Sequence, residues 1–290
     1  MKANLFIVGA CKSGTSYLHD YLGNQKDVCA SSPKEPYFFE LPKEYRNEDD
    51  YINKYFSGYK SEKYLLDSRH RNMFFSYIPN EINKYNKEAK IIFILRNPID
   101  RAFSHWWMWY SRKIISTNFH KAIVEEIKKN KNGEFTMNLN SESYYHYIKN
   151  KAPKGRITYA DANTLVESGL YYQQIKRYFN FFDKEQILIL NFKDLKSVNL
   201  INNELSNFLR IDFKNNIEFN KINKAPFYKK NLRLPFSFLI PQRIKKAIKN
   251  LFFKKPKIKN KTYKLLFDFY KPENEKLIKE FKLNFVKDWI

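Results

Sequence analysis

A turn of small residues follows the first apolar run of the sequence, and its residue types suit the binding of an anion. The stretch Gly9–Ser16 (GACKSGTS) leads from a predicted strand into a predicted helix. Successive backbone N–H groups in such a turn point at one anion, and the helix N-terminus adds partial positive charge. Lys12 adds a full charge, while Thr15 and Ser16 add hydroxyl donors. The motif predicts a phosphate cradle, with an ordinary strand-to-helix turn as the alternative.

The order of Lys12 and Gly14 distinguishes this turn from the loop of nucleotide triphosphatases. In that loop the lysine follows the last glycine, and the next Ser or Thr binds magnesium. Here the lysine precedes the glycine. A kinase or nucleotide hydrolase is therefore the less favoured interpretation, and no His, Cys, Asp or Glu spacing predicts a metal site.

Arginine and serine side chains follow a second apolar run, again where a predicted strand ends. Arg96 comes directly after Ile91–Leu95, and Pro98 suits the first turn of the helix that follows. Arg101 and Ser104 are three residues apart and share a helix face. Arginine offers paired donors to phosphate, and serine offers one hydroxyl. Two neighbouring anion sites predict a ligand with two separated phosphates; the alternative gives Arg101 a salt bridge on the helix surface.

The order of apolar runs predicts an α/β fold with a parallel central sheet flanked by helices. Short apolar runs indicate buried strands at Leu5–Ala10, Lys63–Asp67, Lys90–Leu95 and Gln186–Leu190. Helical patterns accompany them at Ser16–Asn24, Ile99–Arg112, His120–Lys129 and Gly169–Phe182. Such alternation is typical of three layers, with helices on both faces of the sheet. Ligands of these sheets bind at the carboxyl ends of the strands, where both anion sites lie.

The sequence contains no internal repeat and no Pro/Gly/Ser linker, so we expect one domain over residues 1–290. The polar segment 131–165 has weak periodicity and is predicted to be a loop excursion. Residues 240–290 form a helical and basic C-terminal part, which closes with Tyr263–Tyr270 and Pro272–Phe281.

Composition excludes several classes of protein and favours an anionic partner. The chain has 53 Lys and Arg against 30 Asp and Glu, a net charge of +23, and its 18% aromatic residues exclude a disordered basic tail. Two cysteines, Cys11 and Cys29, exclude a disulfide framework and a four-thiolate zinc site. No apolar run is long enough to span a membrane, so we expect a cytoplasmic protein. Because the lysines are spread along the whole chain, nucleic acid is not the predicted partner.

The two anion signatures resemble the cofactor sites of sulfotransferases that use 3′-phosphoadenosine 5′-phosphosulfate (PAPS). The closest branch is that of heparan-sulfate and bacterial glycan sulfotransferases. The signatures are Lys12–Ser16 and the spacing of Arg96, Pro98, Arg101 and Ser104. Further segments match in order at Lys34–Phe39, Gly169–Tyr172, Phe192–Leu195, Tyr270–Leu277 and Trp289. The resemblance runs over residues 4–290, least in 131–165 and 213–260, and implies the three-layer, P-loop-like sulfotransferase fold.

The resemblance implies in-line transfer of a sulfuryl group from PAPS to a hydroxyl of a carbohydrate acceptor, without a metal. It makes Lys12 a catalytic residue at the leaving phosphate. It places the two phosphates of the cofactor on Lys12, the backbone N–H groups of Ser13, Gly14, Thr15 and Ser16, and the side chains of Arg96 and Ser104. Lys229 and Lys230 lie in a stretch that loosely resembles the loop that covers the cofactor or the acceptor.

Glu35 is the general base that the resemblance implies. It lies between Lys34 and Pro36, a stiff and non-helical setting. A surface glutamate paired with Lys34 is the alternative reading. The cytosolic branch that sulfates small phenols and steroids uses a histidine base instead, and His70 and His105 lie near the predicted ligand edge.

One segment departs from the family pattern. Some relatives have an acidic residue followed by lysine and then Ser or Thr after the second strand. Here Asp67 fits the acidic position, but Ser68 occupies that of the lysine. Arg69 or Arg71 then supplies the charge from a shifted geometry, and an arginine is a poor proton donor.

The stretch 244–252 has apolar residues at helical spacing within a basic surround. It suits either a helix packed on the sheet domain or peripheral contact with an anionic membrane. The remaining alternatives for the whole chain are a small-molecule or lipid acceptor, a nucleotide-dependent kinase, and a noncatalytic basic binding module. The oligomeric state is not predicted.

Overall fold

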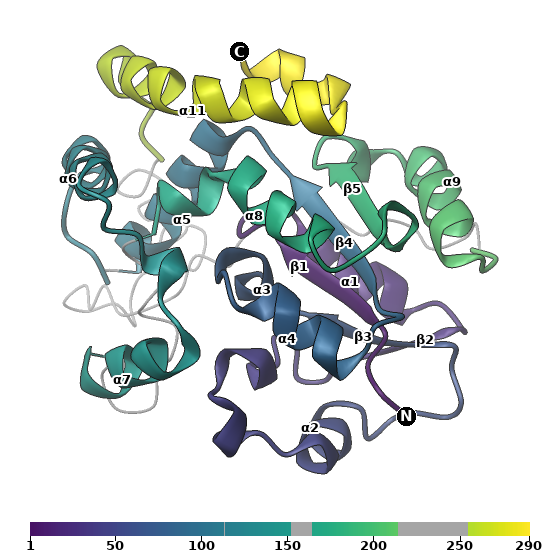
Figure 1. The fold of residues 1–290 in the computed structure, drawn as a ribbon. Helices are drawn as coiled ribbons and strands as arrows, with labels where there is room; N and C mark the ends of the chain where they lie inside the picture. The colour runs from purple at the N-terminus through teal and green to yellow at the C-terminus, as the bar shows by residue number, and fades with distance from the viewer. Residues whose placement is uncertain (113, 152–163, 214–254) are drawn as a thin grey trace, which may run out of the picture.

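Five parallel strands form the centre of the fold, in the order β2-β3-β1-β4-β5 (Figure 1). The computed structural model describes residues 1–112, 114–151, 164–213 and 255–290. The strands are β1 Leu5–Gly9, β2 Val28–Ala30, β3 Tyr64–Ser68, β4 Lys90–Leu95 and β5 Ile187–Asn191. The helices are α1 Thr15–Gly23, α2 Glu48–Tyr55, α3 Arg71–Phe74, α4 Ile78–Tyr85, α5 Pro98–Ser111, α6 Phe119–Lys131, α7 Ser141–Lys151, α8 Tyr171–Phe179, α9 Val198–Leu209 and α11 Asn260–Phe281.

Both faces of the sheet are buried, because successive side chains of each strand point to opposite sides. In β1, Phe6 and Val8 belong to one hydrophobic cluster, and Leu5 and Ile7 belong to the other. Residues of α1 and α9 cover the second cluster, and residues of α3, α4, α8 and α11 cover the first. Figure 1 shows α3, α4 and α8 in front of the sheet and α1 behind it. The predicted three-layer α/β architecture is confirmed.

The prediction of a loop over 131–165 is wrong for Ser141–Lys151, which forms α7. This helix has a weak apolar pattern, and Tyr144 is its buried side chain among the described residues. The Tyr144 ring packs on Phe75 with centroids 4.2 Å apart, and its hydroxyl contacts Arg71 and Glu40. Tyr147 and Ile148 are only partly buried against the core, so the apolar set of this helix is short and its periodic signal is weak.

Two further elements differ from expectation. Strand β2, Val28–Ala30, is too short to give a recognisable apolar run. The two closing helical segments form one helix, α11, with Pro272 inside it. Buried Tyr270 and Leu277 lie on either side of this proline, and their packing against the core outweighs the missing hydrogen bond.

In the part of the chain that the structure describes, no helix is long and apolar enough to cross a membrane. The predicted amphipathic stretch 244–252 lies outside the described residues.

Candidate functional site

The turn between β1 and α1 lies at the carboxyl end of the central strand. Its conformation requires a glycine at position 14, where φ is 90° and an added Cβ would approach Leu195 Cδ1 to 2.5 Å. The first turn of α1 has no acidic residue and no side-chain cap, so its N–H groups face outward unneutralised. The Ser13 N–H bonds to the Ala10 carbonyl at 3.2 Å. The outward donors of the predicted cradle are therefore those of Gly14, Thr15 and Ser16.

Lys12 and Arg96 lie together, because β1 and β4 are adjacent and end at the same edge of the sheet. Arg96 Nη1 donates to the backbone oxygen of Lys12 at 3.3 Å. Lys12 Nζ lies 3.5 Å from Met108 Sδ on α5. Burial lowers the pKa of Lys12, and so do the positive charges of Arg112 and Arg96. A bound anion would relieve this repulsion.

Arg96 is held in place from two sides. Its guanidinium stacks on Phe192, with the carbon 4.9 Å from the ring centre. Its backbone oxygen accepts a hydrogen bond of 2.9 Å from the Tyr171 hydroxyl. Burial lowers the pKa of Arg96, while the charge of Asp100 opposes this shift.

Arg101 has neither of the two roles considered for it. It is fully buried, and it donates to the Leu165 backbone oxygen and to His105 Nδ1, the latter at 3.3 Å. The expectation of a salt bridge on the helix surface is wrong because α5 turns this face into the core. Ser104 lies one turn along on α5 and is half-buried.

Glu35 follows β2 in a loop and has a φ of 69°, which non-glycine residues rarely adopt. Its carboxylate meets three basic side chains, with Lys34 Nζ at 3.1 Å, Arg69 Nη1 at 3.4 Å and His70 Nδ1 at 3.4 Å. Burial alone would raise the pKa of Glu35, but His70, Lys34 and Arg69 hold it well below its usual range. The pairing with Lys34 is present, and it is one of three.

The segment after β3 supplies buried charges to the same loop. Ser68 Oγ bonds to His19 Nδ1 at 2.9 Å, so at the position of the lysine this chain has a neutral hydroxyl group with its own partner. Arg69 and Arg71 are almost fully buried, and both pair with the carboxylate of Glu40. Arg69 also contacts the carboxylate of Glu35. Burial raises the pKa of Asp67 to about 7.

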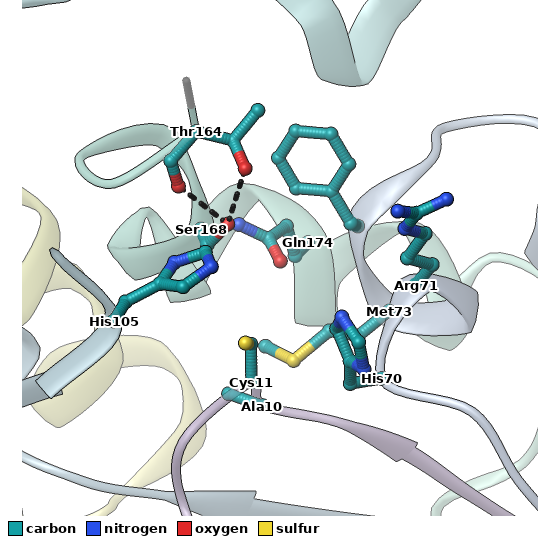
Figure 2. A pocket seen from close by; sticks show the side chains of 10 residues that line it. Ala10, Cys11, His70, Arg71, Met73, His105, Thr164, Ser168 and Gln174 are labelled. Atoms are coloured by element: carbon teal, nitrogen blue, oxygen red, sulfur yellow. Dashed lines mark hydrogen bonds between the residues drawn. The ribbon is translucent and has the colours of Figure 1, made fainter. Parts of the chain in front are cut away.

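A small cavity is lined in part by Cys11, the residue before Lys12 (Figure 2). Its lining includes Cys11 from the turn between β1 and α1, His70 from the segment after β3 and His105 from α5. Burial would raise the pKa of the Cys11 thiol, but His105 and His70 bring it well below its usual value. The residues therefore gather polar groups of three elements around one small space.

Several parts of this site escaped the sequence reasoning. Glu40 belongs to no sequence motif, and no role in the site was predicted for Cys11. Arg112 and Lys255 add positive charge close to Lys12, but neither belongs to a motif. Lys229 and Lys230 lie outside the described residues. Among the described residues, no group of three or more His, Cys, Asp or Glu side chains is arranged to hold a metal ion.

Comparison with known proteins gives distant relatives whose names all include sulfotransferase. A membrane-associated sulfotransferase, kil1, of Dictyostelium discoideum is 25% identical over 266 residues, covering 72% of this chain and 56% of that protein. Carbohydrate sulfotransferase 15 of Mus musculus is 22% identical, covering 66% and 40%. The bifunctional heparan sulfate N-deacetylase/N-sulfotransferase 1 of Xenopus laevis is 29% identical, covering 67% and 20%. The chain thus spans about half or less of these relatives.

A solved sulfotransferase from Alicyclobacillus acidocaldarius has the same fold. Its TM-score is 0.66 at 20% sequence identity, and the match covers 96% of this chain and 95% of that one. The P-loop-like sulfotransferase fold implied by the sequence is therefore confirmed. The model of the sulfotransferase domain family matches residues 2–271, and the chain belongs to this family.

Proposed function

We propose that the chain transfers a sulfuryl group from PAPS to a hydroxyl group of a carbohydrate acceptor. The observation that carries the proposal is the hydrogen bond of 3.3 Å from Arg96 to the Lys12 backbone. This bond joins the Arg96 side chain to the backbone of Lys12, which precedes a helix N-terminus without an acidic residue in its first turn. This donor set fits a nucleotide with two separate phosphate groups.

Different groups of the chain suit the two phosphate ends of such a sulfuryl donor. Lys12 and the N–H groups of Gly14, Thr15 and Ser16 suit the 5′-phosphate end, where negative charge grows as the sulfuryl group leaves. Arg96 and Ser104 suit the 3′-phosphate. Donors fixed in advance where charge develops are typically worth a few kcal/mol each. We further propose that Lys229 and Lys230 cover the bound donor or acceptor.

An in-line transfer forms a bond between the acceptor oxygen and sulfur, and it breaks the bond from sulfur to the 5′-phosphate oxygen, which keeps the electron pair. The acceptor proton needs a base, and we assign this role to Glu35, whose carboxylate pairs with Lys34 and Arg69. The low pKa of Glu35 keeps it ionised and able to accept at neutral pH.

Two observations favour a carbohydrate acceptor. Relatives of the chain are named for carbohydrate and heparan sulfate sulfotransfer. The net charge of +23 also suits acceptors that are themselves anionic, as many glycans are.

The test measures thermal unfolding with adenosine 3′,5′-bisphosphate, the desulfated donor. We expect the melting temperature to rise without magnesium, because ligand that binds only the folded state stabilises it. Arg96→Ala should abolish the rise. Lys90→Ala is the matched control: it removes a cation from the other end of β4, where Lys90 bonds to Phe208 O, and should keep the rise. A shift only with ATP and magnesium would overturn the proposal in favour of a kinase.

A further inference from the structure

A buried cluster of charged side chains lies behind Glu35; we call Glu40, Arg69, Arg71 and Tyr144 the Glu40 cluster. Glu40 and Arg71 are each 2% exposed, and Arg69 is 5% exposed. Arg69 Nε donates to Glu40 Oε1, while Arg71 Nη1 and the Tyr144 hydroxyl each donate to Glu40 Oε2 at 3.2 Å. One carboxylate therefore faces two buried guanidinium groups. Buried charges are costly unless they are paired, so each of these guanidinium groups needs negative charge close by.

Glu35 meets that demand through Arg69. Arg69 Nη1 lies 3.4 Å from Glu35 Oε2 and 3.5 Å from the Glu35 backbone oxygen. A guanidinium is planar, so fixing Nε on Glu40 also fixes the direction of Nη1. Glu40 thereby sets where both the backbone and the carboxylate of Glu35 lie. The left-handed backbone of Glu35 needs such contacts, because a non-glycine residue does not adopt it without support.

Glu40 also controls how much positive charge Glu35 experiences. Burial would lower the pKa of Arg69, but the negative charge of Glu40 raises it, so the two are strongly paired. If Glu40 were neutral, the full charge of Arg69 would act on Glu35. The pKa of Glu35 would then fall further, and a carboxylate with a lower pKa is a weaker base.

We propose that Glu40 is a positioning residue for the base Glu35: acting through Arg69, it fixes the carboxylate in place and keeps it basic enough to accept the acceptor's proton. The inference rests on the proposed function. Glu40 acts through Arg69, which donates to the carboxylates of both Glu40 and Glu35.

The experiment is a double-substitution cycle of Glu35→Gln and Glu40→Gln. Turnover is the consumption of 35S-labelled PAPS with desulfated heparin present, so hydrolysis by water is counted as well as transfer. We expect Glu35→Gln to lower kcat about 10²-fold or more. Glu40→Gln should lower it about tenfold to a hundredfold. Added to Glu35→Gln, the second change should cost less than about twofold, because its route through Glu35 is already lost.

The pH profile gives a readout that a structural role would not move. Because Glu40→Gln lowers the pKa of Glu35, the acidic limb of kcat should shift to lower pH. Glu273→Gln is the matched control, since Glu273 forms a partly buried ion pair with Lys276 at 3.2 Å on α11, an element that carries neither Glu35, Glu40 nor Arg69. It should change neither kcat nor the profile. Equal losses from Glu40→Gln in both Glu35 backgrounds, or an unmoved limb, would overturn the inference.

Arg69→Lys is a second variant that tests the same link if Glu40→Gln does not fold. One ammonium keeps the charge but cannot bridge both carboxylates, so kcat should fall in the same way and again show no further loss with Glu35→Gln. Binding of adenosine 3′,5′-bisphosphate is followed in every variant and should stay unchanged. A wild-type chain that fails to bind this nucleotide refutes the proposed function; one that binds it while the cycle shows no coupling refutes only the role of Glu40.

Discussion

Arg101 decides which nitrogen of His105 carries the proton. A guanidinium only donates, so His105 Nδ1 must accept at 3.3 Å and the neutral ring carries its proton on Nε2. His105 and His70 line the same cavity as Cys11 (Figure 2). Both lower the pKa of the Cys11 thiol, although burial opposes them. The thiol next to Lys12 therefore ionises more readily than an ordinary cysteine.

This predicts different titrations for the two cysteines. The pKa of Cys29 is raised by burial and by the charge of Glu62, so it serves as an internal control. Alkylation by iodoacetamide, followed for each cysteine by peptide mass spectrometry, should rise with pH at a lower midpoint for Cys11 than for Cys29. The midpoint is compared rather than the rate, because Cys11 is the more buried of the two. A Cys11 midpoint at or above that of Cys29 would show that the imidazoles do not act on it.

At the scale of elements, the strands and most helices could be predicted from the sequence, because each buries apolar residues at a regular spacing. β1, β3, β4 and β5 were predicted within about two residues, and the carboxyl-edge rule brought Lys12 and Arg96 to one place. α7 was missed because its apolar set is short: Tyr144 is buried, while Tyr147 and Ile148 are only partly buried. Glu40 was missed for a different reason. A buried ion pair between residues far apart in sequence has no spacing, so only the folded chain reveals it.

The contact between α6 and the segment before α8 predicts a pH-dependent stability. Glu126 on α6 accepts from the backbone N–H groups of Val166 and Glu167 at 2.8 and 2.9 Å. Burial raises the pKa of Glu126 to about 8, and the charge of Glu167 adds to this. The folded chain therefore holds a proton that the unfolded chain releases near its ordinary pKa. Stability present at low pH must be lost as pH rises from about 5 to about 8.

Glu126→Gln keeps an oxygen for both N–H groups but cannot ionise. We expect its free energy of unfolding, measured by urea denaturation, to fall less between pH 5 and pH 8 than that of the wild type. Glu125→Gln is the control, because the Glu125 side chain is 55% exposed and pairs only with Lys121 at the surface. If both variants kept the full wild-type slope, the loss would belong to other groups, such as Asp67.

At the scale of the whole molecule, the last residues support the predicted 3′-phosphate site from behind. Trp289 is 5% exposed, and its ring meets that of Tyr171 with centroids 6.1 Å apart. Tyr171 is fully buried and donates to the Arg96 backbone at 2.9 Å. The packing of Trp289 is thus linked through Tyr171 to Arg96 at the end of β4. No local sequence pattern predicts contacts between residues so far apart in the chain.

Trp289→Ala tests this continuity. Removing a buried tryptophan typically costs about 3–5 kcal/mol of unfolding free energy, and the relaxed Tyr171 should also let Arg96 shift. We expect a lower urea midpoint together with weaker binding of adenosine 3′,5′-bisphosphate under conditions where the variant is still folded. Ile290→Ala is the matched control, because Ile290 is 44% exposed and its truncation should stay within about 0.5 kcal/mol of wild type. Unchanged nucleotide affinity in a destabilised Trp289→Ala would mean that the C-terminal packing stabilises the fold without shaping the site, and Tyr171 would then hold Arg96 unaided.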